Sequence, residues 1–250
     1  MPAPIAIIGG TGLTSLSTLT LTRREMVPTP FGEPSGPLVH GELQGCPVVF
    51  LPRHGAHHTI PPHKINYRAN LWALKHIGVT RVIAVAAVGG IREDMAPGVI
   101  AFPDQIIDYT FGRAHTFFEQ DLEEVVHVDF TWPYSSALRQ ALIHAARTCD
   151  LKARESATYG ATQGPRLETA AEIRRLARDG CDVVGMTGMP EAALARELAL
   201  EYATCAVVAN WGAGITDGEI TMAEIQRHLA DGMAKVKGLL NALMPALAAG

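Results

Sequence analysis

The sequence has few cysteines, no block of basic residues and no long apolar run. Its four cysteines lie far apart in 250 residues and form no C-x-x-C pair, which favours reduced, mostly buried thiols over disulfides or a zinc cage. Lysine and arginine do not cluster and the net charge is −4, so neither nucleic acid nor a membrane surface is an expected partner. No run approaches a membrane span, and the first residues lack the pattern of a signal peptide. These absences predict a cytoplasmic protein.

What the sequence contains is an alternation of apolar strands and amphipathic helices. Since 48% of the residues are apolar and no linker or repeat interrupts them, one domain over residues 1–250 is expected. Strands are predicted at residues 5–8, 47–51, 81–88, 182–186 and 202–209. Helices are predicted at about 65–77, after the capping boxes that begin at Thr169 and Thr221, and from Pro190. The pattern predicts an α/β fold with a twisted, mixed and partly parallel sheet that carries helices on both faces.

The first glycine-rich turn, IIGGTG at residues 7–12, directly follows a predicted strand. Glycines at such a place let the backbone turn tightly and present N–H groups to an anion, although an ordinary turn has the same composition. A dinucleotide-binding fold requires G-x-G-x-x-G leading into a helix. Here Gly12 is followed by a threonine- and proline-rich stretch. A dinucleotide-binding oxidoreductase is therefore the less favoured alternative.

A histidine cluster follows the second predicted strand, with His54, His57, His58 and His63 in one short segment. A metal-dependent hydrolase is the alternative to consider, but the spacing matches no familiar ligand pair and the cluster contains no carboxylate. Arg53 beside His54 fits an oxyanion better, because a guanidinium binds phosphate in a fork and repels a metal ion. The other three histidines are interpreted as surface or packing residues, and no metal site is predicted.

Thr187 stands at the end of a predicted buried strand, just before a helix. A hydroxyl group and free N–H groups at a helix N-terminus form a natural phosphate site. A threonine that merely begins a helix has the same pattern. Both interpretations stay open on this motif alone.

Together these segments resemble the family of trimeric purine nucleoside phosphorylases and methylthioadenosine phosphorylases. The resemblance covers nearly the whole chain apart from about residues 111–126, with the motifs in the same order. The matching segments are IIGGTG, TPFGEPSGPL, RHGAHHTIPPHKINYRANLWALK, GGIREDMAPG, QGPRLETAAEIR and DVVGMTGMPEAALARELAL. The resemblance implies a phosphorylase fold, a homotrimer and phosphorolysis with inorganic phosphate as co-substrate, without a metal or organic cofactor.

The resemblance also implies a role for individual residues. His54, Glu168 and Asn210 would be the catalytic residues, and His127 would reach the 5′ end of the sugar from a neighbouring subunit. Met186 would lie against the ribose. The implied phosphate-binding residues are Thr11, Arg53, His54, Ala87 through its backbone, and Thr187. The implied purine-binding residues are Gly89, Leu167, Glu168 and Asn210.

Two positions depart from the family pattern. The family usually has a hydroxyl residue or asparagine just before the position of Ala87, where this chain has Ala86. One phosphate contact is therefore expected to be missing. Leu167 stands where the family usually has phenylalanine against the base, so stacking on the purine is expected to be weaker.

Asn210 and Glu168 indicate which purine is bound. An amide offers a donor and an acceptor, so Asn210 could donate to a 6-oxo group and accept the proton on N7. Glu168 could accept the N1–H of hypoxanthine or guanine, whereas adenine has no N1–H and mismatches both residues. Adenine-selective members of the family carry aspartates at the positions of Asn210 and Gly212. A 6-oxopurine is therefore predicted, unless Glu168 only flanks the Thr169 cap and points to solvent.

The sugar is indicated by the start of the C-terminal helix, where Met222 and Ile225 occupy positions that line the 5′ pocket in the family. Apolar residues there suit a methylthio group, because a 5′-hydroxyl would be left unpaired. Both residues would equally fit the core face of an amphipathic helix. The combination predicts S-methyl-5′-thioinosine as substrate in purine salvage. Methylthioadenosine, inosine and guanosine remain the alternatives.

Overall fold

The computed structural model describes residues 3–13, 16, 18–120 and 122–248, and its centre is a pair of long parallel strands. The strands are β1 (Ile5–Gly9), β2 (Thr20–Glu25), β3 (Leu38–Leu43), β4 (Cys46–Pro52), β5 (Arg81–Gly90), β6 (Ile100–Ala101), β7 (Gln105–Asp108), β8 (Ala153–Arg154), β9 (Thr158–Ala161), β10 (Val183–Gly185) and β11 (Glu201–Trp211). The helices are α1 (Tyr67–His76), α2 (Ser136–Thr148), α3 (Ala170–Arg178), α4 (Gly188–Glu197) and α5 (Met222–Ala248), with a short 3₁₀ turn at Pro62–Lys64. All the strands belong to one mixed sheet.

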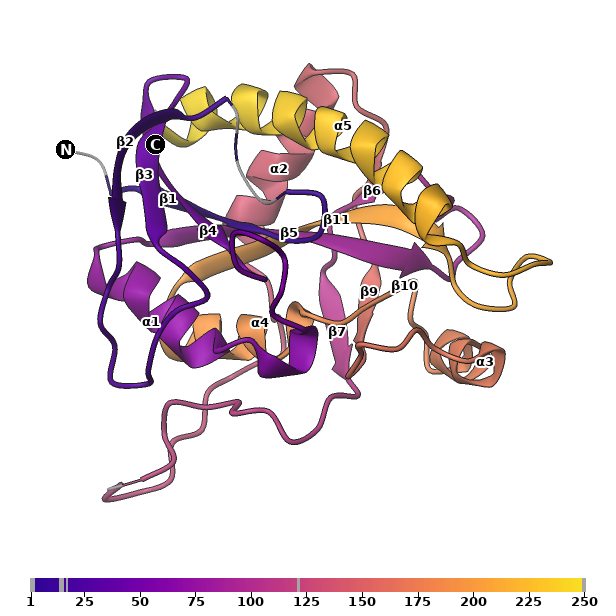
Figure 1. Ribbon diagram of the computed structural model, residues 1–250, viewed down its shortest axis with the longest axis horizontal. Helices are drawn as coiled ribbons and strands as arrows, with labels where there is room; N and C mark the ends of the chain where they lie inside the picture. Colours follow the sequence, from indigo (N-terminus) through magenta and orange to yellow (C-terminus); the bar gives the residue numbers. More distant parts are fainter. Residues whose placement is uncertain (1–2, 14–15, 17, 121, 249–250) are drawn as a thin grey trace.

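The sheet carries helices on both faces, as expected: α2 and α5 cover one face and α1 and α4 the other (Figure 1). The central strand β5 has no polar side chain after Arg81, because both of its faces are covered. Val82 and Ala84 pack in the core under α1 and α4, whereas Ile83 and Val85 pack in the core under α2 and α5. The period-two alternation of a strand thus divides one sequence run between two cores.

The sheet branches along one side of β5. There β1 pairs in parallel with residues 81–84, and β10 pairs antiparallel with Gly89 and Gly90, while β11 occupies the other side along the whole strand. Among the described pairings, residues 85–88 therefore have no strand partner on the β1 side. This gap brings the carboxyl ends of β1 and β10 to the same stretch of β5.

The five strands predicted from sequence are confirmed, each to within a few residues. The predicted capping box at Thr169 is present in full, with Thr169 and Glu172 each accepting a hydrogen bond from the other's backbone N–H. At the second box Thr221 accepts from the Glu224 amide at 3.3 Å, and α5 follows as expected. Regular helical geometry in α4 begins after Met189, so Pro190 takes the first helical position that its sequence indicated.

Several elements were not predicted from sequence, namely strands β2, β3, β6, β7, β8 and β9 and helix α2. The stretch 109–133 contains neither helix nor strand among its described residues and extends from the body as a long loop (Figure 1). No helix in the described part of the chain has both the length and the apolar character needed to cross a membrane.

Candidate active site

A cavity of about 800 Å³ opens at the branch in the sheet, and we call it the main cavity. Its walls come from the ends of β1, β4, β5, β10 and β11, together with the segment before α3 and the start of α5. Its lining residues are Gly10, Thr11, Arg53, His54, Pro62, Ala86, Ala87, Val88, Gly89, Leu167, Glu168, Val184, Gly185, Met186, Thr187, Ala209, Asn210, Gly212, Ala213, Ile220 and Ile225. Most of these residues stand at or just beyond the ends of strands.

The residues predicted to bind phosphate all lie in this lining. Thr11 is in the turn after β1, and the Arg53 amide just beyond β4 donates to the carbonyl of Gly9 at 2.9 Å, which ties the two strand ends together. Gly10 lies so close to Ala86 and Arg53 that a Cβ there would be 2.9 Å from the Arg53 Nη1 atom. Only glycine therefore lets the first turn approach the guanidinium.

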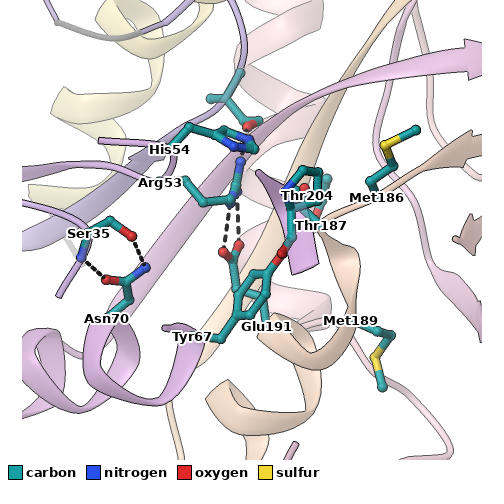
Figure 2. A network of polar contacts seen from close by, with 12 residues as sticks. Ser35, Arg53, His54, Tyr67, Asn70, Met186, Thr187, Met189, Glu191 and Thr204 are labelled. Atoms are coloured by element: carbon teal, nitrogen blue, oxygen red, sulfur yellow. Dashed lines mark hydrogen bonds and ion pairs between the residues drawn. The ribbon is translucent and has the colours of Figure 1, made fainter. Parts of the chain in front are cut away.

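Arg53 departs from its expected role in one respect. Its side chain is 1% exposed, and its Nε and Nη2 atoms donate to the two carboxylate oxygens of Glu191 at 2.7 and 2.9 Å (Figure 2). The Nη1 atom donates to the carbonyl of Val85 at 2.9 Å. The prediction that its fork binds phosphate is thus wrong for the Nε–Nη2 edge, because Glu191 already occupies it. Of the five N–H groups of an arginine, two remain beyond these three contacts.

Glu191 was not singled out from the sequence, although it is fully buried on α4. It accepts a third hydrogen bond, from the hydroxyl of Tyr202 at 2.8 Å. Burial disfavours the charged form of Arg53, but the Glu191 carboxylate more than offsets this and raises the pKa of Arg53. Arg53 is therefore a fixed, buried cation in the lining of the main cavity.

His54 is held beside Arg53 in a defined tautomer. Its Nδ1 atom lies 2.8 Å from the carbonyl oxygen of Ile60, which can only accept, so Nδ1 carries the proton. Burial, and next the charge of Arg53, lower the pKa of His54 to about 4. The ring is therefore neutral near pH 7, and its Nε2 atom is an acceptor.

His58 was interpreted as a surface or packing residue, and it is exposed, but it also contacts this end of the cavity. Its ring centroid lies 4.4 Å from that of His54, and its Nε2 atom is 3.4 Å from the hydroxyl of Thr11. Its place beside the site depends on the turn at Gly55 and on its own positive φ of 54°. His57 is exposed and His63 is half-buried. In the described ranges, no three histidine, cysteine, aspartate or glutamate side chains gather as metal ligands would.

Thr187 lies at the end of β10, is 7% exposed and faces the cavity near Arg53 (Figure 2). It precedes α4, whose regular geometry begins only after Met189, and its side chain makes no capping hydrogen bond. The hydroxyl is thus not used to begin the helix. This observation favours the phosphate-site interpretation over that of a simple helix-start residue.

Asn210 reaches the cavity because β11 is irregular at this point. The pairing of β11 with β5 shifts between Val208 and Asn210, so that Ala209 forms a bulge and Asn210 pairs with Gly89. Bulges of this kind re-aim a side chain next to an active site. The Nδ2 atom of Asn210 donates to the carbonyl of Trp211 at 2.7 Å, which leaves its second N–H and its carbonyl oxygen for a ligand.

Glu168 does not simply point to solvent. Its Oε1 atom accepts a hydrogen bond from the hydroxyl of Thr162 at 2.6 Å, and its side chain lines the main cavity. The capping box of α3 uses Thr169 and Glu172 instead. Leu167 also lines the cavity but is 43% exposed, as expected for a side chain at the cavity mouth.

The residues predicted for the sugar end are only partly brought together. Met186 and Ile225 line the main cavity, and Ile220 joins them as an apolar residue that was not predicted. Met222 does not: it is 63% exposed and lies outside the lining, because the buried stripe of α5 begins only at Ile225. His127 is exposed on the long loop and lies outside the lining of its own chain's cavity, so its contribution to another subunit stays a prediction.

Comparison with known proteins identifies the family of this chain. The sequence model of the Phosphorylase superfamily matches residues 4–245. A protein of Pseudomonas syringae pv. tomato, named probable S-methyl-5′-thioinosine phosphorylase, is 55% identical over 241 residues, 96% of this chain and 98% of that protein. The 6-oxopurine nucleoside phosphorylase of Pyrococcus furiosus is 46% identical over 246 residues, 96% of this chain and 92% of that protein.

The fold is equally close to a solved structure. Methylthioadenosine phosphorylase from Schistosoma mansoni, in complex with adenine, superimposes with a TM-score of 0.96 at 32% identity, over 100% of this chain and 93% of that one. The predicted phosphorylase fold is thereby confirmed. This chain belongs to the phosphorylase superfamily and is a nucleoside phosphorylase.

Proposed function

We propose that this chain catalyses phosphorolysis of S-methyl-5′-thioinosine, giving hypoxanthine and 5-methylthioribose 1-phosphate. The observation that carries the proposal is the layout of the main cavity along β5. Phosphate-binding groups gather around Ala86, and the purine-reading side chain of Asn210 lies beside Gly89. At ~3.3 Å per residue these points are about 10 Å apart along the strand, which leaves room for the sugar between phosphate and purine.

The phosphate is both the nucleophile and the charge that stabilises the reacting sugar. One phosphate oxygen forms the new bond to the anomeric carbon as the bond to the purine nitrogen breaks, and the electron pair of that bond passes to the purine. Positive charge develops on the sugar, next to a bound anion held in place before the reaction. Thr11, Thr187, the backbone at Ala87 and the remaining N–H groups of Arg53 hold this anion.

The neutral state of His54 sets the direction of its hydrogen bond with phosphate. Because its Nε2 atom accepts, it receives a hydrogen bond from the P–O–H group of monohydrogen phosphate. A protonated imidazole would instead donate to a P–O⁻ oxygen. His54 thereby keeps the proton of the phosphate away from the oxygen that attacks.

The leaving purine, which carries the electron pair of the broken bond, takes a proton at N7 from solvent, and Asn210 stabilises this product by accepting the N7–H through its carbonyl oxygen. Its free N–H donates to the 6-oxo group, and Glu168 accepts the N1–H. Adenine would place an amino donor against the amide donor and an unprotonated N1 against the carboxylate. Each mismatch costs about 1–3 kcal/mol, so two of them separate the bases by orders of magnitude.

The methylthio group fits the apolar residues Ile220 and Ile225 beside Met186. The name of the Pseudomonas syringae relative supports this choice of substrate. We further propose that the active form is a cytoplasmic homotrimer acting in purine salvage, with His127 of each chain completing a neighbouring site. Phosphate is the co-substrate, and the proposed reaction needs no metal ion or organic cofactor.

The decisive experiment compares methylthioinosine, methylthioadenosine and inosine, each with and without phosphate. We expect phosphate-dependent cleavage with the highest kcat/KM for methylthioinosine. Faster cleavage of methylthioadenosine would overturn the assignment of Glu168 and Asn210 as readers of a 6-oxopurine. A preference for inosine would overturn only the methylthio part. Calorimetry with nicotinamide dinucleotides and metal analysis after chelation check the two remaining classes, a dinucleotide-binding oxidoreductase and a metal-dependent hydrolase.

A further inference from the structure

Glu168 forms part of the boundary between two cavities. On one side is the main cavity, and on the other is a second cavity of about 740 Å³, which contains Thr162, Arg166 and Arg175. Glu168 lines both. A flexible carboxylate in this place has two directions open to it, and only one of them presents it to the purine.

The hydroxyl of Thr162 holds the carboxylate at this boundary. Thr162 follows β9, and its own backbone is fixed on both sides: its N–H donates to the carbonyl of Gly185 at 2.8 Å, and its carbonyl accepts from Arg113 at 3.3 Å. The hydroxyl lies 2.6 Å from Oε1 of Glu168. A backbone fixed in this way gives the hydroxyl a defined position from which to hold the side chain.

The charges of the second cavity compete with this hydrogen bond for the carboxylate. Arg166 and Arg175 both line it, and they are already engaged, Arg166 with Glu172 at 2.7 Å and Arg175 with the ring of Tyr109. Two guanidinium groups nevertheless attract a neighbouring carboxylate. Without the hydrogen bond from Thr162, Glu168 is therefore expected to leave the boundary and move further towards these two guanidinium groups, away from the purine.

We propose that Thr162 is a positioning residue that determines base specificity by fixing Glu168 at the edge of the purine pocket. It occupies Oε1 and leaves Oε2 to accept the N1–H of a 6-oxopurine. A carboxylate in this state has only acceptors to offer, so it has no donor for the N1 atom of adenine. The inference rests on the proposed 6-oxopurine phosphorolysis and assigns its selectivity to a residue behind the one that touches the base.

The test is a double-mutant cycle of Thr162→Val and Glu168→Ala, with Thr162→Ser as the conservative variant. Thr162→Val should lower kcat/KM for the 6-oxopurine nucleoside by about tenfold, the scale of a lost hydrogen bond to a charged group, mainly through the KM of the nucleoside. The KM of phosphate should not change. Thr162→Ser keeps the hydroxyl group and should retain most of the wild-type activity. In the Glu168→Ala background, Thr162→Val should have no further effect.

A matched control exists outside the site. Thr116 donates to Glu197 at the same distance of 2.6 Å, and neither residue lines the main cavity, so Thr116→Val removes an equivalent bond and should leave base selectivity unchanged. If Thr162→Val does not fold, as judged by thermal unfolding, Thr162→Ala removes the same hydroxyl and replaces it in the cycle.

The inference is overturned if Thr162→Val matches the wild type, or if it costs as much without Glu168 as with it. A wild-type enzyme that cleaves only adenine nucleosides would overturn the proposed function, and this inference with it, before any variant is compared.

Discussion

At the scale of single residues, internal hydrogen bonds already fix the direction in which side chains of the proposed site can donate or accept. Asn210 illustrates this best, since one of its N–H groups is committed to the carbonyl of Trp211 at 2.7 Å. That bond orients the amide before a ligand arrives. The remaining N–H and the carbonyl oxygen then form a donor–acceptor pair that matches O6 and N7 of a 6-oxopurine.

Replacing Asn210 by aspartate should reverse this match. Asn210→Asp removes both N–H donors and sets a carboxylate against the carbonyl of Trp211, so kcat/KM for methylthioinosine should fall by about 10²-fold or more. Activity on methylthioadenosine should fall much less, because its 6-amino group can donate to the new oxygen. The ratio of the two kcat/KM values measures the effect, and the KM of phosphate serves as internal control. An unchanged ratio would show that Asn210 does not read the base.

His54 should make stability depend on pH in a defined window. Its pKa is lowered to about 4, below the ordinary value near 6.5, so the unfolded chain binds the proton more readily than the folded one between these values. Stability is therefore fully present above about pH 6.5 and falls as the pH approaches 4, by about 3 kcal/mol for an isolated group. Denaturant unfolding of wild type and His54→Gln across this range should show a shallower decline in the variant. Equal slopes would contradict the buried, neutral ring.

The sequence located most of the residues that line the main cavity, because they stand in short motifs at strand ends. It could not locate Glu191 or Thr162. Glu191 and Arg53 are 138 residues apart in the sequence, and no local pattern predicts their ion pair. The histidine segment could be located from the sequence, but the contact of His58 with Thr11 could not, since that contact depends on a backbone turn at positive φ.

At the scale of elements, the ion pair of Arg53 and Glu191 fastens α4 to the end of β4. Both side chains are buried, and Tyr202 on β11 adds a hydrogen bond, so three elements meet at one carboxylate. Such a pair contributes little relative to apolar residues, but losing one member leaves a buried charge uncompensated. The helix that begins just after Thr187 is thereby tied to the cation of the same site.

Glu191→Gln should therefore lower the free energy of unfolding by about 3–5 kcal/mol. A matched control is Glu155→Gln, which breaks the exposed pair with Arg147 and should cost less than about 1 kcal/mol. Urea denaturation of both variants gives the comparison. Equal losses would mean that burial does not govern the Arg53 pair.

The sequence predicted elements best where an apolar run or a cap was local. The central strand β5 and the capping box of α3 are examples. Strands β6 and β8 have only two residues each and exist through their pairing partners, so no periodicity could reveal them. Helix α2 was not predicted, although the sequence contains a signal for it. Ser135 caps the helix, and Leu138 and Leu142 lie one turn apart on its buried face.

At the scale of the whole molecule, the long loop that carries His127 exposes apolar side chains that its own chain does not cover. Exposed apolar side chains gather on it, among them Phe111 at 71% and Val125 at 72%. Large exposed apolar side chains in one region are typical of a surface that another protein covers. This pattern supports the proposed homotrimer.

Subunit mixing tests the proposed assembly directly. His127→Ala and Glu168→Ala should each be weakly active alone, since each removes one residue from every site. Mixed trimers prepared by joint unfolding and refolding should regain activity, because some sites receive Glu168 from one chain and His127 from another. Sedimentation should report three chains for each preparation. Activity in the mixture no higher than the average of the two variants would contradict a shared site.

The bulge at Ala209 divides β11 into a part that packs in the cores and a part that borders the main cavity. Up to Val208, β11 must keep its register with β5, since its side chains fill the two cores. Beyond the bulge, Asn210 and Trp211 pair with Gly89 and Gly90 in a register shifted by one residue, and neither belongs to the two cores. A substitution at the proposed base-reading position, Asn210, is therefore expected to leave the packing of both cores unchanged. In this chain, substrate preference can thus be altered separately from the stability of the fold.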